Sequence, residues 1–237
     1  MSIAGKHAVV TGGGRGIGRA TADLLERRGA RVSVVSRSAG VRGDVTDEEQ
    51  VRKAFEECRE ANGPIAILVN NAGIAESAAL TRTDRATWDR IIAVNLTGTF
   101  LCTREALPDM IAAGWGRIVN VASVAGLEGA PYIAAYCASK HGVVGFTKAV
   151  AAEYADKGIT ANVVCPGYTD TEMLGRTLAN ITAKTGRSER ETREVLARGN
   201  PAGRIAAPEE VAEAIVALAM GAQTGLALVV PHPERSA

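Results

Sequence analysis

The chain has 237 residues, 46% of them hydrophobic, and its 27 basic and 26 acidic side chains leave a formal net charge of +1. This balance gives no electrostatic reason to expect nucleic acid or an anionic membrane as a partner. The apolar runs are too short to span a bilayer, and the chain enters a strand without the apolar region of a signal peptide. The four cysteines are scattered and the three histidines isolated. We therefore expect no metal site, and reduced thiols in a cytoplasmic protein.

Short apolar strands alternate with segments of helical periodicity along the chain. The predicted strands are residues 7–12, 30–36, 64–73, 116–123, 159–167 and 226–230. The predicted helices are residues 17–28, 46–61, 84–113, 132–157, 171–198 and 208–220. Thr46 and Glu49 are expected to form a capping box at the start of the second helix. Apolar strands that alternate with helices indicate a parallel sheet covered on both faces. We predict one doubly wound α/β domain of the Rossmann type over residues 1–237, with about seven strands.

One connection departs from this pattern. The sequence predicts a further strand almost directly after the second one, with only Ser38, Ala39 and Gly40 between them. Parallel neighbours usually need a dozen or more residues. Three residues with their flanks reach about 14 Å at ~3.5 Å per residue. The crossover helix is therefore missing, and three explanations stay open: an abbreviated third strand, a bare extended crossover, or residues of the natural protein that this sequence lacks.

A glycine-rich turn, TGGGRGIG at Thr11–Gly18, follows the first strand and opens the first helix. Glycines allow positive φ and let backbone N–H groups approach a phosphate, while the helix N-terminus adds partial positive charge. The turn indicates a dinucleotide or phosphate site. The alternative is a purely structural turn between strand and helix.

The spacing TGxxxGxG resembles the nucleotide loop of the short-chain dehydrogenase/reductase family. Later motifs resemble the same family in order, over nearly the whole chain. They are DVT at 44–46, NNAG at 70–73, Asn95 in VNLTGTF, Ser123 in NVASVAG, YCASK at 136–140 and PGYTDT at 166–171. The family resemblance implies a small-molecule substrate, a nicotinamide cofactor and a homo-oligomer, either tetramer or dimer.

Four residues of these motifs carry the expected chemistry. Tyr136 and Lys140 are four apart on a predicted helix and share a face. A nearby ammonium favours the phenolate, so we expect Lys140 to lower the tyrosine pKa from about 10. Such a tyrosine can donate a proton to a carbonyl oxygen, or remove one in the reverse reaction. Ser123 ends a strand, where open α/β sheets bind ligands. The resemblance makes Tyr136 the acid/base, Ser123 the polarising group, Lys140 also a ribose ligand, and Asn95 the support of a relay water.

The alternatives without a catalytic role are that Tyr136 and Lys140 are solvated side chains on a helix and that Ser123 caps a turn. The resemblance also implies contacts to the cofactor from several other segments, including the adenine side (Asp44) and the nicotinamide side (Ile17, Thr171). The full predicted cofactor-binding set is Gly12, Gly14, Arg15, Gly16, Ile17, Gly18, Ser36, Arg37, Asp44, Val45, Asn71, Ala72, Gly73, Tyr136, Lys140, Pro166, Gly167, Thr169 and Thr171.

The end of the second strand bears on which nicotinamide is bound. An acidic residue there would bind the 2′-hydroxyl of NAD and repel a phosphate. Here the strand ends in Ser36-Arg37, and Arg15 lies in the glycine turn. Two guanidiniums and a hydroxyl suit a 2′-phosphate, so we predict NADP(H) in preference to NAD(H). The alternative is that both arginines are solvated surface residues.

We predict an NADP(H)-dependent oxidoreductase that interconverts a carbonyl and a secondary alcohol. Residues 169–198 are expected to form a lid, which resembles that of 3-oxoacyl-thioester reductases and 3-hydroxyacyl-CoA dehydrogenases. The substrate predicted from this resemblance is a 3-oxoacyl thioester of CoA or an acyl carrier. Basic residues of the lid either approach its phosphates or are simply solvated: Arg176, Lys184, Arg187 and Arg190. The alternatives are a reductase of a cyclic, aromatic or polyketide ketone, and a non-catalytic NADP-binding sensor or assembly subunit.

Overall fold

A single parallel sheet of seven strands runs through the computed structural model, which describes residues 1–231; residues 232–237 lie outside the described part. The strand order is β3-β2-β1-β4-β5-β6-β7. The strands are β1 His7–Thr11, β2 Arg31–Ser36, β3 Val41–Arg42, β4 Ile65–Asn70, β5 Gly116–Val121, β6 Ile159–Pro166 and β7 Ala227–Val230. The predicted fold class, a doubly wound sheet of about seven strands, is confirmed.

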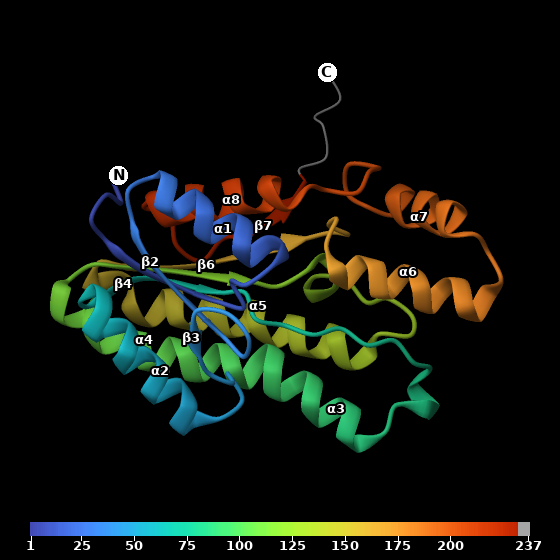
Figure 1. Ribbon diagram of the computed structural model, residues 1–237, viewed down its shortest axis with the longest axis horizontal. Coiled ribbons are helices and arrows are strands. Elements are labelled where there is room, and N and C mark those ends of the chain that lie inside the picture. The colour runs from blue at the N-terminus through green and yellow to red at the C-terminus, as the bar shows by residue number, and fades with distance from the viewer. Residues whose placement is uncertain (232–237) are drawn as a thin grey trace.

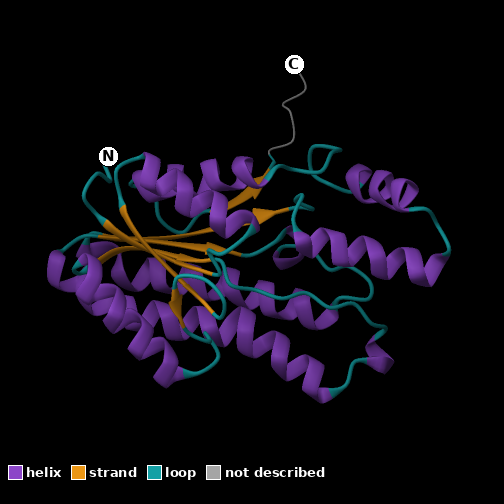
Figure 2. Ribbon diagram, viewed as in Figure 1, coloured by secondary structure: helices purple, strands orange, loops and turns teal. Residues whose placement is uncertain are grey.

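Helices cover both faces of the sheet (Figures 1 and 2). They are α1 Gly16–Arg27, α2 Glu48–Asn62, α3 Arg85–Ile92, α4 Gly98–Ala113, α5 Ala134–Tyr154, α6 Glu172–Thr185, α7 Glu189–Arg198 and α8 Pro208–Met220. α1 and α8 lie on one face, while α2, α4 and α5 lie on the other. Each face has its own core, so consecutive strand residues such as Val9 and Val10 are both buried, in opposite cores. This two-sided burial explains why the strands are apolar throughout. No helix among residues 1–231 is long and apolar enough to cross a bilayer.

The connection from β2 to β3 contains no helix, as predicted, and the third strand is abbreviated in the structure. β3 has only two residues and pairs with the last two residues of β2, Val35 with Val41 and Ser36 with Arg42. Because β3 begins beside the carboxyl end of β2, the chain does not have to run back along that strand. Gly40 has φ +67°, and a Cβ there would overlap the carbonyl oxygen of Val34. The turn therefore packs directly on β2.

The cap predicted for the second helix is wrong by one residue. α2 begins at Glu48, and the carboxylate of Asp47 accepts a hydrogen bond from the Gln50 N–H. The N–H and hydroxyl of Thr46 instead donate to Asp44, at 2.9 and 2.8 Å. A carboxylate one position later thus takes the capping role, and it also suits the positive end of the helix dipole.

Two predicted helices are divided in the structure. The helix expected over 84–113 begins after its cap, Asp84, and a π-helical turn at Ala93–Thr97 separates α3 from α4. The helix expected over 171–198 breaks at Gly186, which has φ +70°. Ser188 then starts α7 with a capping box. α6 and α7 lie beyond the carboxyl edge of the sheet (Figure 1), where the lid was predicted.

Candidate active site

The glycine-rich turn and the NNAG turn meet where the order of strands reverses, between β1 and β4. The residues paired in register at the ends of these strands are Thr11 and Asn70. Loops leave such a switch point toward opposite helical layers, and the crevice between them is where open α/β sheets bind ligands. Both predicted motifs therefore lie at the same edge of the sheet.

Hydrogen bonds fasten these two turns together. The Asn71 amide donates to the carbonyls of Thr11 and Gly12 at 3.0 and 3.1 Å. The Thr11 hydroxyl accepts from the N–H groups of Asn71 and Ala72 at 3.1 and 3.2 Å. A Cβ at Gly12 would lie 2.9 Å from the Ala72 Cα, and one at Gly18 would overlap the Asn71 amide. Asn71, predicted as a cofactor contact, thus holds the glycine turn in shape with its side chain.

The start of α1 fits a phosphate. Arg15 occupies the N-cap position with an extended backbone and makes no side-chain bond to the first turn, whereas Asp47 caps α2. The first N–H groups of α1 therefore have no side-chain acceptor and are available to an anion. Gly16 has φ +52°, and a Cβ there would lie 3.1 Å from the Thr171 Cγ2. Ile17 is partly buried and packs against the core on the α1 side of the sheet. This part of the chain fits the pyrophosphate of a dinucleotide.

Lys140 lies at the centre of the predicted catalytic group. It is 4% exposed, and its ammonium donates to the Val121 carbonyl at 2.8 Å. Its Nζ lies 5.7 Å from the centroid of the Tyr136 ring. A Cβ at Gly73 would be 3.6 Å from this Nζ and 3.3 Å from the Asn95 Oδ1, so the NNAG turn lies directly against both side chains. Burial lowers the pKa of Lys140 to about 8.

The pKa of Tyr136 moves opposite to the expectation. Burial raises it to about 12, and the hydrogen bond with Ser123 opposes that rise without cancelling it. The expected net lowering of the tyrosine pKa is therefore wrong for the protein on its own, because desolvation of the phenolate is the largest cause. At neutral pH the phenol is protonated and can act as a proton donor.

Asn95 lies in the π-helical turn and is 1% exposed. Its Oδ1 accepts from the Ile74 N–H at 2.8 Å, and its Nδ2 donates to the Ile74 carbonyl at 2.9 Å and to the Ser139 hydroxyl at 3.0 Å. Ser139 in turn donates to the Tyr136 carbonyl at 2.7 Å. Asn95 thus joins the NNAG loop to the helix that carries the tyrosine. π-helical turns inside helices are frequent at functional sites.

Ser139, whose hydroxyl links Asn95 to the helix of Tyr136, was not identified from the sequence. Ser139 is fully buried. In the sequence, its position as a small polar residue inside the YCASK motif could have identified it. Ser123 follows β5. The Ala122 N–H before it donates to the Val164 carbonyl at 2.8 Å, which places Ser123 next to β6. Its hydroxyl also accepts from the Ala125 N–H at 3.2 Å. The serine therefore caps a turn and contacts the tyrosine phenol.

The predicted site for the 2′-phosphate lies at the turn after β2 and, unlike the cluster around Lys140, is exposed. The Ser36 hydroxyl donates to the Ala39 carbonyl at 2.7 Å and accepts from the Ala39 N–H at 2.8 Å, which closes the turn to β3. Arg37 is exposed and has no hydrogen bond or ion pair with any residue in the described range. A Cβ at Gly14 would lie 2.9 Å from the Ala39 Cβ, so the glycine turn touches this connection. Arg37 is therefore a free cation at the rim of the glycine turn.

The other predicted contacts of this end have partners within the protein. Arg15 pairs with Glu172 at 2.5 Å, and both side chains are 61% exposed. The Asp44 Oδ1 accepts two hydrogen bonds from Thr46. Val45 is buried between α2 and α4. Arg15 consequently lies between the glycine turn and the start of α6, with its guanidinium directed at a carboxylate.

The residues after β6 are held by an asparagine that the sequence motifs did not identify. Pro166 ends β6, and a Cβ at Gly167 would overlap the Asn200 amide. This amide accepts from the Tyr168 N–H at 2.6 Å and donates to the Tyr168 carbonyl at 2.7 Å. The Thr171 hydroxyl donates to the carbonyl of Thr169 at 3.3 Å. Tyr168, 39% exposed, is therefore presented from a fixed backbone.

One ion pair joins the two ends of the predicted lid, and contacts to Ser77 attach the lid to the loop after β4. Asp170 pairs with Arg193 of α7 at 2.8 Å, and the Asn180 amide of α6 donates to the Ser77 hydroxyl at 2.7 Å. The four basic lid residues singled out in the sequence are all exposed. Lys184 reaches the Ser77 carbonyl at 3.4 Å. Arg190 pairs with Glu194 at 3.8 Å, and Arg176 and Arg187 are the other two predicted cations. Their positions favour neither a phosphate contact nor simple solvation.

Comparison with known proteins agrees with this geometry. The family model described as short chain dehydrogenase matches residues 6–41 and 36–182, two stretches that overlap at the abbreviated connection. Cis-4-hydroxycyclohexanecarboxylate dehydrogenase of Sinomonas cyclohexanicum is 42% identical, over 93% of this chain and 92% of its own length. The 3-oxoacyl-(acyl-carrier-protein) reductase of Thermotoga maritima is 40% identical, over 92% of each chain. The crystal structure of an actinorhodin polyketide ketoreductase variant with NADPH superposes with a TM-score of 0.90 at 36% identity, covering 95% of both chains.

Proposed function

The chain belongs to the short-chain dehydrogenase family and is an NAD(P)-dependent oxidoreductase acting on hydroxyl and keto groups, and we propose that it uses NADP(H), with Tyr136 as its acid/base. The observation that carries the role of Tyr136 is the buried cluster at the carboxyl edge of the sheet. There Lys140 lies beside the Tyr136 ring and Asn95 ties the helix of the tyrosine to the NNAG loop. Ser123 hydrogen-bonds the phenol.

The residues that would hold the cofactor run from the uncapped start of α1 to Thr171. Bound there, the nicotinamide would supply a hydride in reduction and accept one in oxidation. The first turn of α1 offers backbone N–H groups to the pyrophosphate, and Gly73 keeps the NNAG loop close to Lys140. The absence of side-chain bulk along this path fits a dinucleotide that lies against the backbone.

Tyr136 donates the proton in one direction of the reaction and accepts it in the other. In reduction, the protonated phenol of Tyr136 donates to the carbonyl oxygen, and its pKa of about 12 keeps it protonated at neutral pH. The Ser123 hydroxyl binds the same oxygen and orients it. The Lys140 ammonium, fixed by the Val121 carbonyl, favours the phenolate that proton transfer leaves behind. In oxidation the same phenolate has to be formed first, so that direction gains from higher pH.

The preference for NADP(H) rests on Arg37 and Arg15. Arg37 is exposed and free of protein partners within residues 1–231. The pair of Arg15 with Glu172 is exposed, and such pairs are worth about 1 kcal/mol or less, so a phosphate can replace the carboxylate. The NADPH in the similar ketoreductase structure supports this preference. Comparing kcat/KM for NADPH and NADH tests it, and a clear preference for NADH would refute it.

The first candidate substrate is a 3-oxoacyl thioester, as the name of the Thermotoga maritima relative suggests. Tyr168 favours a second candidate, a cyclic ketone. Its side chain, 39% exposed, lies near enough to Tyr136 for a charge on Tyr168 to raise the pKa of Tyr136. An aromatic side chain beside the proton donor suits a flat or alicyclic ring. The 42% identical cis-4-hydroxycyclohexanecarboxylate dehydrogenase supports this second candidate by its name.

NADPH oxidation with a substrate panel separates these candidates. The panel contains acetoacetyl-CoA, an acyl-carrier β-ketoester, 4-oxocyclohexanecarboxylate and a bulky bicyclic ketone. We expect the highest kcat/KM for one class, and its identity decides between thioester and ring. Tight NADPH binding without turnover of any ketone would instead indicate a non-catalytic NADP-binding protein. A homo-oligomer and a cytoplasmic location stay predictions, which light scattering and cell fractionation can test.

A further inference from the structure

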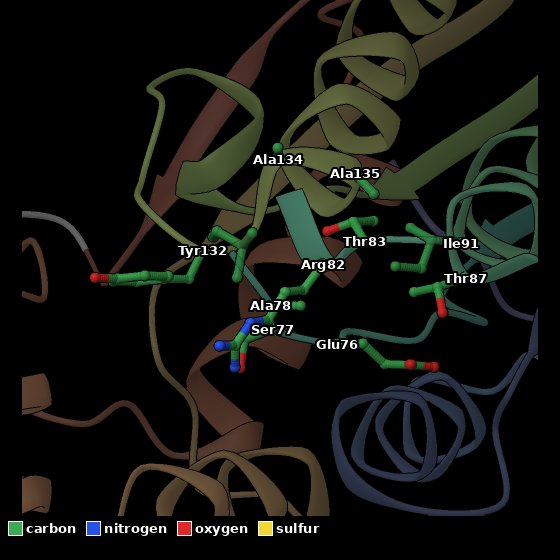
Figure 3. A pocket seen from close by; sticks show the side chains of 11 residues that line it. Glu76, Ser77, Ala78, Arg82, Thr83, Thr87, Ile91, Tyr132, Ala134 and Ala135 are labelled. Carbon is green, nitrogen blue, oxygen red and sulfur yellow. The ribbon is translucent and has the colours of Figure 1, made fainter. Parts of the chain in front are cut away.

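A hollow of about 80 Å³ lies between the loop after β4 and the segment that enters α5. One wall consists of residues between 76 and 91, and the other of residues 132–135, immediately before Tyr136 (Figure 3). The hollow is separate from the predicted cofactor path, because it shares no residue with the glycine turn or the β2–β3 connection.

Arg82 supplies a cation to this hollow. It lines the hollow, and its guanidinium makes no hydrogen bond or ion pair with any of residues 1–231. Figure 3 shows its side chain running past Ala78 toward Ser77. Guanidinium groups bind carboxylates through two parallel hydrogen bonds, which makes an unpaired arginine in a hollow a natural ligand for such an anion.

The other charges around the hollow do not cancel this cation. Glu76, the acidic residue of the lining, is already bound by Arg90, with two contacts of 2.8 Å from one guanidinium nitrogen. Lys184 of α6 donates to the Ser77 carbonyl at 3.4 Å and adds a second cation at the rim. The surroundings therefore favour an anion. The hydroxyls of Ser77 and Thr87 add hydrogen-bonding groups to the lining.

The opposite wall is held in a strained conformation. Among the described residues, Tyr132 is the one non-glycine residue with a positive φ, +69°. Its carbonyl accepts from the Ala78 N–H at 2.8 Å, a bond that links the two walls. Its ring points away from Ile91 and Thr87, so the hollow stays open (Figure 3). Such strain persists where surrounding contacts impose it, and it concentrates at ligand-binding sites.

We propose that this hollow binds the carboxylate of a small organic acid, with Arg82 as its charged ligand. The hollow is small, so we expect it to hold the carboxylate group while the rest of the acid lies outside it. The carboxylate has two possible sources. It belongs to the far end of the substrate, in which case the inference rests on the proposed function, or it belongs to a separate ligand that acts on the helix of Tyr136.

Binding of cyclohexanecarboxylate, which has no hydroxyl or keto group, tests the site without catalysis. Isothermal titration of the full-length protein should show weaker binding to Arg82→Gln by about 10- to 100-fold, the effect of losing hydrogen bonds to a charged group. Arg82→Lys should fall between the two. Arg85→Gln is the matched control, because that exposed arginine pairs with Asp89 on α3. Circular dichroism verifies folding. Equal affinity in Arg82→Gln and the unchanged protein, no binding to the unchanged protein, or equally tight binding of cyclohexanecarboxamide would overturn the proposal.

Steady-state kinetics then distinguish the two sources. If the carboxylate belongs to the substrate, Arg82→Gln raises KM for 4-oxocyclohexanecarboxylate and leaves KM for its methyl ester unchanged. If it belongs to a separate ligand, both substrates keep their KM, and cyclohexanecarboxylate changes kcat only when Arg82 is present. Either pattern supports the site. Because the titration needs no turnover, loss of the proposed reductase activity and loss of the carboxylate site remain separate results.

Discussion

The proposed catalytic group around Lys140 and the proposed adenosine end around Arg37 are built on opposite principles. Asn95 and Lys140 are almost completely buried and are held by hydrogen bonds of 2.8 to 3.0 Å. Arg37, at the other end, is exposed and has no partner in the described chain. A four-residue turn, closed by the hydroxyl of Ser36, carries it there.

This difference separates two requirements. Proton transfer depends on groups held in place before the substrate arrives, which burial and mutual hydrogen bonds provide. Selection of a phosphate depends on charge, which an exposed guanidinium supplies without a fixed geometry. Substitutions at the catalytic end should therefore change the rate greatly and cofactor choice little. Substitutions at the adenosine end should do the reverse.

The largest effect is expected for Tyr136→Phe. Removing the proton donor should lower kcat by about 10²- to 10⁴-fold, the usual contribution of general acid–base catalysis. The ring remains, so NADPH binding, followed by quenching of protein fluorescence, should stay within a factor of about two. Tyr154→Phe, at the far end of the same helix, is the control. Unchanged turnover in Tyr136→Phe would refute the role of acid/base.

Lys140→Met should lower activity while it stabilises the protein at neutral pH. Burial lowers the pKa of Lys140 to about 8, so the folded state releases a proton that the unfolded chain still holds up to about 10.5. Below pH 8 the folded protein carries the full penalty of a buried ammonium. Methionine removes it, which should raise the free energy of unfolding by about 1–3 kcal/mol after loss of the bond to Val121.

This gain depends on pH in a defined direction. Between pH 8 and about 10.5 the penalty disappears from the unchanged protein, so the advantage of the methionine variant should shrink as pH rises through that range. Urea denaturation at pH 7 and near pH 10, with both proteins measured in parallel, gives the two differences. A difference that is constant with pH, or that grows, would contradict the buried-charge explanation.

Arg37→Asp should reverse the preference between cofactors. The carboxylate would repel a 2′-phosphate and could accept a hydrogen bond from a 2′-hydroxyl. We expect kcat/KM for NADPH to fall by about 10- to 100-fold while that for NADH stays level or rises. Arg27→Gln, an exposed arginine at the end of α1, is the control. Equal decreases in kcat/KM with both cofactors would mean that Arg37 does not bind the 2′-phosphate.

The two ends also differ in how well the sequence predicted them. Periodicity and strand composition predicted the sheet, because burial on both faces leaves a continuous apolar pattern. Spacing put Tyr136 and Lys140 on one face of a helix, and the structure places them together. The pKa of Tyr136 was mispredicted, since desolvation depends on neighbours that lie far away in the sequence. Asn200 was missed for the same reason, because it acts 32 residues away from Tyr168.

The course of the chain between β2 and β3 could not be predicted because it depends on one glycine and one hydroxyl. Glycine 40 has φ +67°, and a Cβ there would overlap the Val34 carbonyl. Gly40→Ala should therefore lower the free energy of unfolding by about 1–3 kcal/mol. It should also weaken NADPH binding by a few-fold, since the turn carries Arg37.

Gly145→Ala provides the matched control. That glycine lies inside α5, and nothing lies within 4 Å of the position its Cβ would take. Alanine there should stabilise the protein by up to about 1 kcal/mol, because it favours the helix without a clash. Urea denaturation of both variants measures the contrast. If Gly40→Ala is as stable as the unchanged protein, the turn can adopt another path, and the position of Arg37 no longer follows from the close packing of this connection on β2.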